Sequence, residues 1–136
     1  MSDWNAKVID EFRANAGKVG GQFEGATLLL LHTTGARSGQ ERVHPLVYQA
    51  DGDRLVIFAS KGGAPTNPDW FHNVVANPDV TVEVGVEVVP MRARVTDAQE
   101  RERLWDRQKG LMPGFADYEA KTTRQIPVVV LEPRAA

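Results

Sequence analysis

Positively charged side chains and glycines gather in two short stretches of the sequence. "TTGARSGQERVHP" supplies Arg37 and Arg42 with Ser38 between them, and "ASKGG" supplies Lys61 directly after Ser60. Guanidinium and ammonium groups bind phosphate and carboxylate oxygens, and glycines let backbone amides approach an anion closely. Taken singly, each cation could be an ordinary solvated loop residue. Together they predict an anion-binding site.

A predicted hairpin brings these two stretches to one place. Residues 41–50 and 54–60 are apolar, strand-like segments joined by "DGDR", whose Asp-Gly pair suits a tight turn. The stretch before the first strand and the stretch after the second therefore reach the same end of the strand pair. We expect the anion-binding site at that end.

Residues that could perform chemistry themselves are scarce. No cysteine is present, which excludes thiol chemistry, and His32, His44 and His72 fit no close metal-ligand spacing. GxGxxG and Walker motifs are absent, and no Ser-His-Asp arrangement stands out. His44 is interpreted first as a strand histidine and second as a ligand contact. A site with anion binders and few acids or bases indicates that a bound cofactor carries the reactivity.

Trp70 and Phe71 follow the lysine stretch at the start of a predicted short helix. Aromatic residues in such a place most often belong to the core. The alternative is that their rings wall one side of a flat ligand whose charged tail is bound by the lysine stretch.

The elements that must position these residues are mainly strands. Hydrophobic periodicity and turn residues predict strands at 27–34, 41–50, 54–60, 79–85, 87–95 and 126–133, and helices at 1–16, 67–78, 96–109 and 112–122. Most neighbouring strands are joined by hairpins, which favours a closed antiparallel barrel with peripheral helices. Ser2 and Thr96 are the expected helix caps. The run at 27–34 is expected to be buried on both faces, and the glycines of 17–25 to form a flexible connection.

Length and charge limit the function further. The 136 residues are expected to form one domain, 1–136. A net charge of −2 argues against non-specific nucleic-acid binding, and no apolar run approaches the about 20 residues of a membrane span. The amphipathic helix at 1–16 is expected to dock on the domain or on a partner such as a second copy, ahead of a membrane surface. A cytoplasmic protein is expected.

Three motifs resemble the deazaflavin (F-420)-dependent nitroreductase family of actinobacteria, in the flavin/deazaflavin oxidoreductase class A. They are TTGxxSGxxR, ASKGGAPxxPxW and RxIPVVVL, within a resemblance that covers 26–133. The resemblance implies a split β-barrel of the FMN-binding type that binds coenzyme F-420, an 8-hydroxy-5-deazaflavin. It also implies an oxidoreductase that transfers a hydride from the reduced coenzyme to an activated double bond, a quinone or a nitro acceptor.

The resemblance implies a role for each matching residue. The positions that hold the phosphate region and tail of the coenzyme are Ala36, Arg37, Ser38 and Arg42, with help from Lys61 and Gly62. The strand positions that line its ring are Val43, His44, Pro45, Leu46, Ala59 and Ser60. The helix positions that close the other side are Asp69, Trp70, Phe71 and Asn73.

One segment departs from the nitroimidazole-activating member of the family. That member has tyrosines that contact substrate, whereas the matching residues here are Met112, Phe115 and Tyr118, so only Tyr118 keeps a hydroxyl as a candidate proton donor. We therefore expect weak nitroimidazole reduction, with flat enones, quinones or coumarin-like lactones as better acceptors. In the alternative interpretation, Phe115 and Tyr118 only pack their helix.

Two other functions fit the same residues. An FMN-binding or haem-handling barrel would share the fold, and fold alone does not separate it from an F-420 enzyme. A carrier or sensor that binds F-420 without turnover would explain the scarcity of proton donors equally well.

Overall fold

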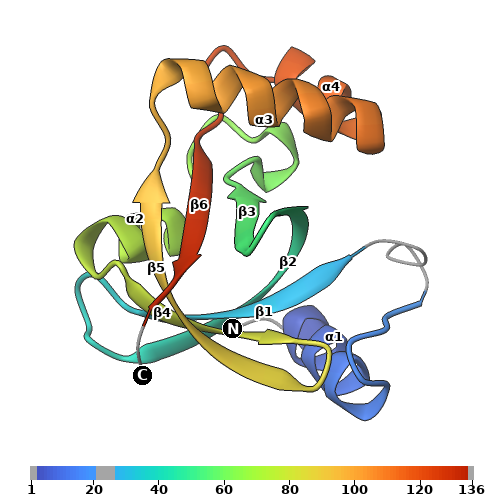
Figure 1. Ribbon diagram of the computed structural model, residues 1–136, viewed down its shortest axis with the longest axis vertical. Coiled ribbons are helices and arrows are strands. Elements are labelled where there is room, and N and C mark those ends of the chain that lie inside the picture. The colour runs from blue at the N-terminus through green and yellow to red at the C-terminus, as the bar shows by residue number, and fades with distance from the viewer. Residues whose placement is uncertain (1–2, 21–26, 135–136) are drawn as a thin grey trace.

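The computed structural model describes residues 3–20 and 27–134. The strands of this part of the chain are β1 (Leu28–Thr34), β2 (Glu41–Asp51), β3 (Arg54–Phe58), β4 (Asp79–Val84), β5 (Glu87–Val95) and β6 (Val128–Pro133). They close into an antiparallel barrel in the order β1-β2-β3-β6-β5-β4 (Figure 1). The helices are α1 (Asp3–Ala14), α2 (Asp69–Ala76), α3 (Ala98–Leu111) and α4 (Gly114–Ala120), with a short 3-10 helix, η2 (Lys61–Gly63). The predicted mainly-β barrel with peripheral helices is confirmed.

Strand β2 is shared between two partners along its length. Its residues 41–47 pair with β1, whereas its residues 48–51 pair with β3. Gly52 has a φ of 65° in the turn between β2 and β3, as the Asp-Gly pair predicts. The first half of β2 therefore has one edge that β3 does not cover.

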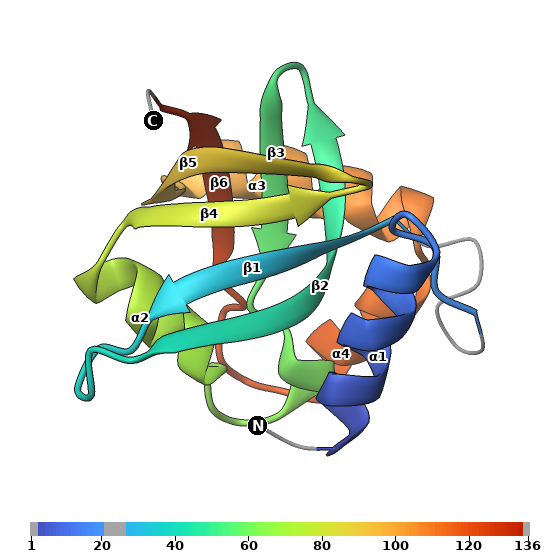
Figure 2. The same cartoon turned by 90° about the horizontal axis from the view of Figure 1, so that it is seen from below.

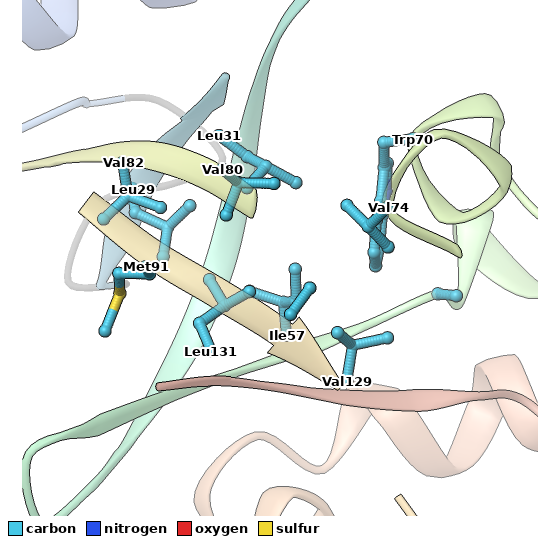
Figure 3. Close-up of a cluster of buried hydrophobic side chains, with 12 residues drawn as sticks. Leu29, Leu31, Ile57, Trp70, Val74, Val80, Val82, Met91, Val129 and Leu131 are labelled. Atoms are coloured by element: carbon cyan, nitrogen blue, oxygen red, sulfur yellow. The ribbon is translucent and has the colours of Figure 1, made fainter. Parts of the chain in front are cut away.

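Strand β1 is buried on both faces, as its continuous apolar run predicts. Leu29 and Leu31 point into the barrel, where they join the interior cluster shown in Figure 3. Leu28 and Leu30 point outward and pack against Phe12 of α1. Figure 2 shows α1 lying beside β1 and β2. The alternation of a strand sends successive leucines to two separate cores.

Strands β3 and β6 are covered in the same way on the opposite side. Ile57 and Val129 point into the barrel, while Phe58 and Val128 point outward to a cluster beneath α3 and α4. Trp105 of α3 is fully buried in that cluster. Helices α3 and α4 therefore close the outer face of β3 and β6 (Figure 1).

Helix α1 docks on the body of the domain, the first of the predicted alternatives. Beyond its apolar contacts, Arg13 Nη2 lies 2.7 Å from Glu83 Oε2 on β4, and His32 Nε2 lies 2.6 Å from the same oxygen. The hydrogen bond from Arg13 lowers the pKa of Glu83. The predicted cap Ser2 and residues 21–25 of the predicted flexible connection lie outside the described residues. No helix in the described ranges has both the length and the apolar character needed to cross a bilayer.

The prediction that Thr96 caps α3 is wrong by one residue. Asp97 is the N-cap, and its Oδ1 accepts a hydrogen bond from the backbone N–H of Glu100 at 2.8 Å. Thr96 instead donates its hydroxyl to the carbonyl oxygen of Val128 at 3.0 Å. Because both residues have a side chain suited to capping, the sequence did not separate them. The position of β6 beside Thr96 decides which one caps the helix.

Candidate functional site

A pocket of about 520 Å³ opens between the start of β2, the η2 turn and the start of α2. Its lining residues are Glu41, Arg42, Val43, His44, Lys61, Pro68, Asp69, Trp70 and Asn73. Its place follows from the strand pairing, because the first half of β2 pairs with β1 alone and the chain after β3 passes beside its other edge. The volume is typical of a small-molecule site. Sequence reasoning did not single out Glu41 or Pro68.

Arg42 and Lys61 meet at this pocket, as the predicted hairpin requires. Both are exposed, and within the described part of the chain neither has a carboxylate within ion-pair distance. Among the residues that the structure describes, Lys61 Nζ donates only to Thr66 Oγ1, at 3.3 Å. Glu41 also lines the pocket, but its carboxylate lies 3.1 Å from Nδ1 of His32. The two cations are therefore available to an anionic ligand.

The turn that presents Lys61 has an unusual backbone. Lys61 has a φ of 48° and Gly63 a φ of 83°, so both lie in the left-handed region. A Cβ on Gly63 would lie 2.8 Å from the carbonyl oxygen of Tyr118 and 2.9 Å from Cβ of Lys121. Only glycine lets η2 approach α4 this closely. The packing of η2 on α4 therefore fixes the position of the Lys61 backbone.

Arg124 holds the same turn from its other side. Its guanidinium donates to the carbonyl oxygens of Ser60 and Ala64, each at 2.9 Å, and to Oδ1 of Asn67 at 2.7 Å. Burial lowers the pKa of Arg124 from its usual value. Among the described residues no carboxylate pairs with Arg124, and its side-chain hydrogen bonds all go to residues 60–67. We call residues 60–67 the lysine loop.

Trp70 belongs both to the core and to the pocket. Its side chain is 4% exposed and packs in the interior cluster with Val74, as Figure 3 shows, and it also lines the pocket. The two interpretations of this residue from sequence are therefore compatible. Phe71 meets Trp70 edge-on, with ring centroids 6.4 Å apart, and packs at the margin of the interior cluster.

A chain of hydrogen bonds leads from the turn after β1 to His44. The backbone N–H of Ala36 donates to Asn73 Oδ1 at 3.0 Å, and Asn73 Nδ2 donates to Thr33 Oγ1 at 3.1 Å. Thr33 Oγ1 lies 3.3 Å from His44 Nε2. Sequence reasoning did not identify Thr33, because a threonine near a strand end carries no distinguishing signal. This chain links α2 to β1 and β2 beside the pocket.

His44 is neutral at pH 7. Burial lowers its pKa from 6.5 to about 4; the carboxylate of Asp69 opposes this shift, and the charge of Arg42 adds to it. A histidine with such a pKa does not serve as a proton donor in its cationic form near neutral pH.

The lowered pKa predicts a pH dependence of stability. Unfolded His44 takes up a proton near pH 6.5, whereas folded His44 does so only near pH 4, so the free energy of unfolding falls as pH drops through this window. The slope contributed by His44 should approach about 1.4 kcal/mol per pH unit. Urea unfolding of the wild type and of His44→Gln between about pH 5 and pH 7 measures it. Equal slopes for the two proteins would contradict the prediction.

Several predicted coenzyme-binding residues lie outside the pocket lining. Arg37 and Ser38 are exposed in the turn at 35–40, where Ser38 Oγ accepts a hydrogen bond from the backbone of Gln40 at 3.2 Å. The others pack in or beside the barrel or form the lysine loop itself; they are Pro45, Leu46, Ala59, Ser60, Gly62 and Phe71. Ala36 contributes its backbone N–H to Asn73. The predicted binding roles of these residues stay predictions.

The predicted substrate residues belong to the outer cluster under α3 and α4. Phe115 is 6% exposed and contacts the rings of Phe58, Trp105 and Tyr118. Met112 and Tyr118 are half-buried at the margin of this cluster, and none of the three predicted residues lines the pocket. Packing accounts for Phe115, and the substrate contacts stay a prediction. No group of three or more metal-ligating side chains occurs in the described ranges.

Residues 4–133 match the family described as F420H(2)-dependent quinone reductase. An F420H(2)-dependent quinone reductase of Mycobacterium tuberculosis is 41% identical over 127 residues, which cover 90% of this chain and 85% of that protein. A second protein of the same organism, named a putative F420H(2)-dependent quinone reductase, is 39% identical over 108 residues, which cover 79% of this chain and 90% of that protein.

Solved structures agree with this assignment. The structure of an F420-H2 dependent reductase, FDR-A, is 42% identical with a TM-score of 0.71, and the match covers 77% of this chain and 93% of that one. More distant neighbours, including a haem storage protein of Vibrio cholerae at 14% identity, share the split-barrel fold alone. The resemblance inferred from the three motifs is therefore confirmed, together with the split barrel and the F-420-dependent reductase class. The chain belongs to the F420H(2)-dependent quinone reductase family.

Proposed function

We propose that the pocket between β2, the lysine loop and α2 binds reduced coenzyme F-420 and that the protein transfers a hydride from it to a quinone. The observation that carries this proposal is the meeting of Arg42 and Lys61 at one pocket with no carboxylate partner in the described residues. Unpaired cations at the rim of a concave site favour an anionic ligand, and a coenzyme with a phosphate-bearing tail is one.

The residues of the pocket suit a ligand with a flat ring and a charged tail. Arg42 and Lys61 would hold the tail, while Trp70 and Val43 supply apolar surface for the ring. When bound, a 5-deazaflavin supplies hydride rather than single-electron chemistry. The task of the protein is to hold one ring face toward the acceptor and to keep water from it. Tyr118, whose backbone packs against η2 although its side chain does not line the pocket, is the proposed proton donor, with solvent as the alternative.

The acceptor can be tested directly. Protein mixed with reduced F-420 and menadione should restore the absorbance of oxidised F-420, and a nitroimidazole in place of menadione should do so more slowly. Binding without acceptor-dependent oxidation would favour the carrier or sensor. Binding of FMN in preference to F-420 in equilibrium dialysis would favour the FMN-binding barrel. Nitroimidazole turnover as fast as quinone turnover would overturn the proposed acceptor preference.

Replacing Lys61 with alanine should weaken F-420 binding by about 1–3 kcal/mol, or about 5- to 150-fold in the dissociation constant. It should also reduce the salt dependence of binding, because one cation no longer meets the ligand. Neither alanine nor lysine is branched at Cβ, so the substitution adds no new steric conflict at a φ of 48° and tests the side chain. Lys7→Ala, at an exposed position of α1, is the control. An unchanged dissociation constant in Lys61→Ala would return Lys61 to the class of solvated loop residues.

The chain is further proposed to form a homodimer. A solved structure described as a domain-swapped dimer is 37% identical with a TM-score of 0.73, and the match covers 96% of this chain and 98% of that one. Val86 and Val88, at 82% and 67% exposure, offer apolar surface at the β4–β5 hairpin that a second copy could cover. Light scattering that returned the mass of a single chain at micromolar concentration would contradict this proposal.

A further inference from the structure

We propose that His44 presents an Nδ1–H donor to the ligand of the pocket, because the hydrogen-bond chain through Asn73 and Thr33 fixes its tautomer. The ligand then needs a carbonyl oxygen or an unprotonated ring nitrogen beside His44. The identity of that ligand rests on the proposed function, whereas the tautomer does not. In this arrangement Asn73 and Thr33 are positioning residues, which act through His44.

The first hydrogen bond of this series, from Ala36 to Asn73, determines which atom donates in each of the following bonds. A backbone N–H can only donate, so the Asn73 side-chain atom 3.0 Å from the amide of Ala36 must be the carbonyl oxygen Oδ1. The amide nitrogen Nδ2 must then face Thr33, where it lies 3.1 Å from Oγ1. Because Nδ2 has only hydrogens to offer, Thr33 Oγ1 is the acceptor in this bond.

The hydroxyl hydrogen of Thr33 has one available acceptor among the described residues, Nε2 of His44. Thr33 is 2% exposed, so almost none of its surface meets bulk solvent even though it borders a shallow surface pocket at 32–34. Its two polar neighbours among the described residues are the donor Asn73 Nδ2 and His44 Nε2, the latter at 3.3 Å. A buried hydroxyl hydrogen without an acceptor is costly, so Thr33 donates to His44 Nε2. Nε2 must therefore be the ring nitrogen without a proton.

A neutral imidazole with an unprotonated Nε2 has its proton on Nδ1. Burial keeps the ring neutral at pH 7, with Arg42 adding to this effect and Asp69 opposing it. In the described part of the chain Nδ1 has no hydrogen-bond partner, although His44 lines the pocket. A polar hydrogen in a partly buried position calls for an acceptor, and a ligand in the pocket can supply it.

The tautomer can be measured in the free protein by ¹⁵N NMR of the histidine rings at pH 7. His44 signals, assigned by their loss in His44→Asn, should show a protonated Nδ1 and an unprotonated Nε2. Thr33→Val removes the hydroxyl with little change of shape and should shift these signals toward a mixture of tautomers, while Thr33→Ser should retain them. A protonated Nε2 or an imidazolium at pH 7 in the wild type would overturn the proposal, as would wild-type signals in Thr33→Val.

Two substitutions of His44 test the contact with the ligand. Asparagine places an amide N–H near the position of Nδ1, whereas glutamine places one near that of Nε2. F-420 titrations should therefore show a dissociation constant about two- to tenfold larger for His44→Gln than for His44→Asn, which means weaker binding. Equal affinities would overturn the donor role. If the wild type binds no F-420, the proposed function fails, and the NMR measurement still decides the tautomer.

Discussion

Replacing Arg124 with alanine is expected to lower the free energy of unfolding by about 2–4 kcal/mol, because three acceptors of the lysine loop lose their donor at once. The same change should weaken F-420 binding about as strongly as Lys61→Ala, although Arg124 does not line the pocket. The reason is that Lys61 depends on this loop for its left-handed backbone. Urea unfolding and F-420 titration measure the two effects.

Three comparisons make this prediction specific. Arg107→Ala removes an exposed arginine of α3 that also donates to a backbone carbonyl, and it should change stability by no more than about 0.5 kcal/mol. Arg124→Lys restores the charge but not the fork of donors, so it should recover only part of the loss. In the double variant with Lys61→Ala, the two losses of F-420 affinity should be less than additive. Additive losses would mean that Arg124 does not act through Lys61.

The second large effect is expected from Gly63→Ala, which should cost about 2–5 kcal/mol of stability. About 1–2 kcal/mol arises from the left-handed backbone, at a φ of 83°. About 1–3 kcal/mol more arises from the clash of the new Cβ with the carbonyl oxygen of Tyr118, which as a backbone atom has no rotamer to escape to. Thermal and urea unfolding measure the sum. Because η2 must move away from α4, F-420 binding should weaken as well.

Gly52→Ala is the matched control for this substitution. Gly52 also has a positive φ, 65°, but a Cβ built there meets nothing within 4 Å. It should therefore show the backbone cost alone, about 1–2 kcal/mol, with unchanged F-420 binding. If the two variants lose equal stability, the close approach of η2 to α4 contributes nothing.

Local signals in the sequence were sufficient for the elements of the fold. The leucine run of β1 predicted a doubly buried strand, and the Asp-Gly turn predicted the β2–β3 hairpin, because both depend on residues adjacent in the chain. The place of β6 between β3 and β5 depends on contacts between distant segments. That same contact took Thr96 out of its expected capping role.

In the site, too, only the features that depend on residues close together in the sequence were predictable. Arg42 and Lys61 meet because one hairpin carries both, which the sequence reveals. Arg37 does not line the pocket, because the conformation of the turn at 35–40 decides where its side chain lies. The spacing of residues in the sequence does not reveal that conformation. Arg124 lies 60 or more residues along the chain from the carbonyls that it binds. The sequence around an arginine does not indicate which distant backbone carbonyls will accept its hydrogen bonds. Its partners became visible only with the fold.

The location of β6 in the barrel has a consequence for synthesis on the ribosome. Residues 128–133 are hydrogen-bonded to both β3 and β5, so the ring of strands stays open until this late segment has left the exit tunnel. Arg124, just before it, emerges at nearly the same moment. The nascent chain thus has the lysine loop before it has Arg124, so the loop cannot take its Arg124-bound shape until residue 124 has emerged.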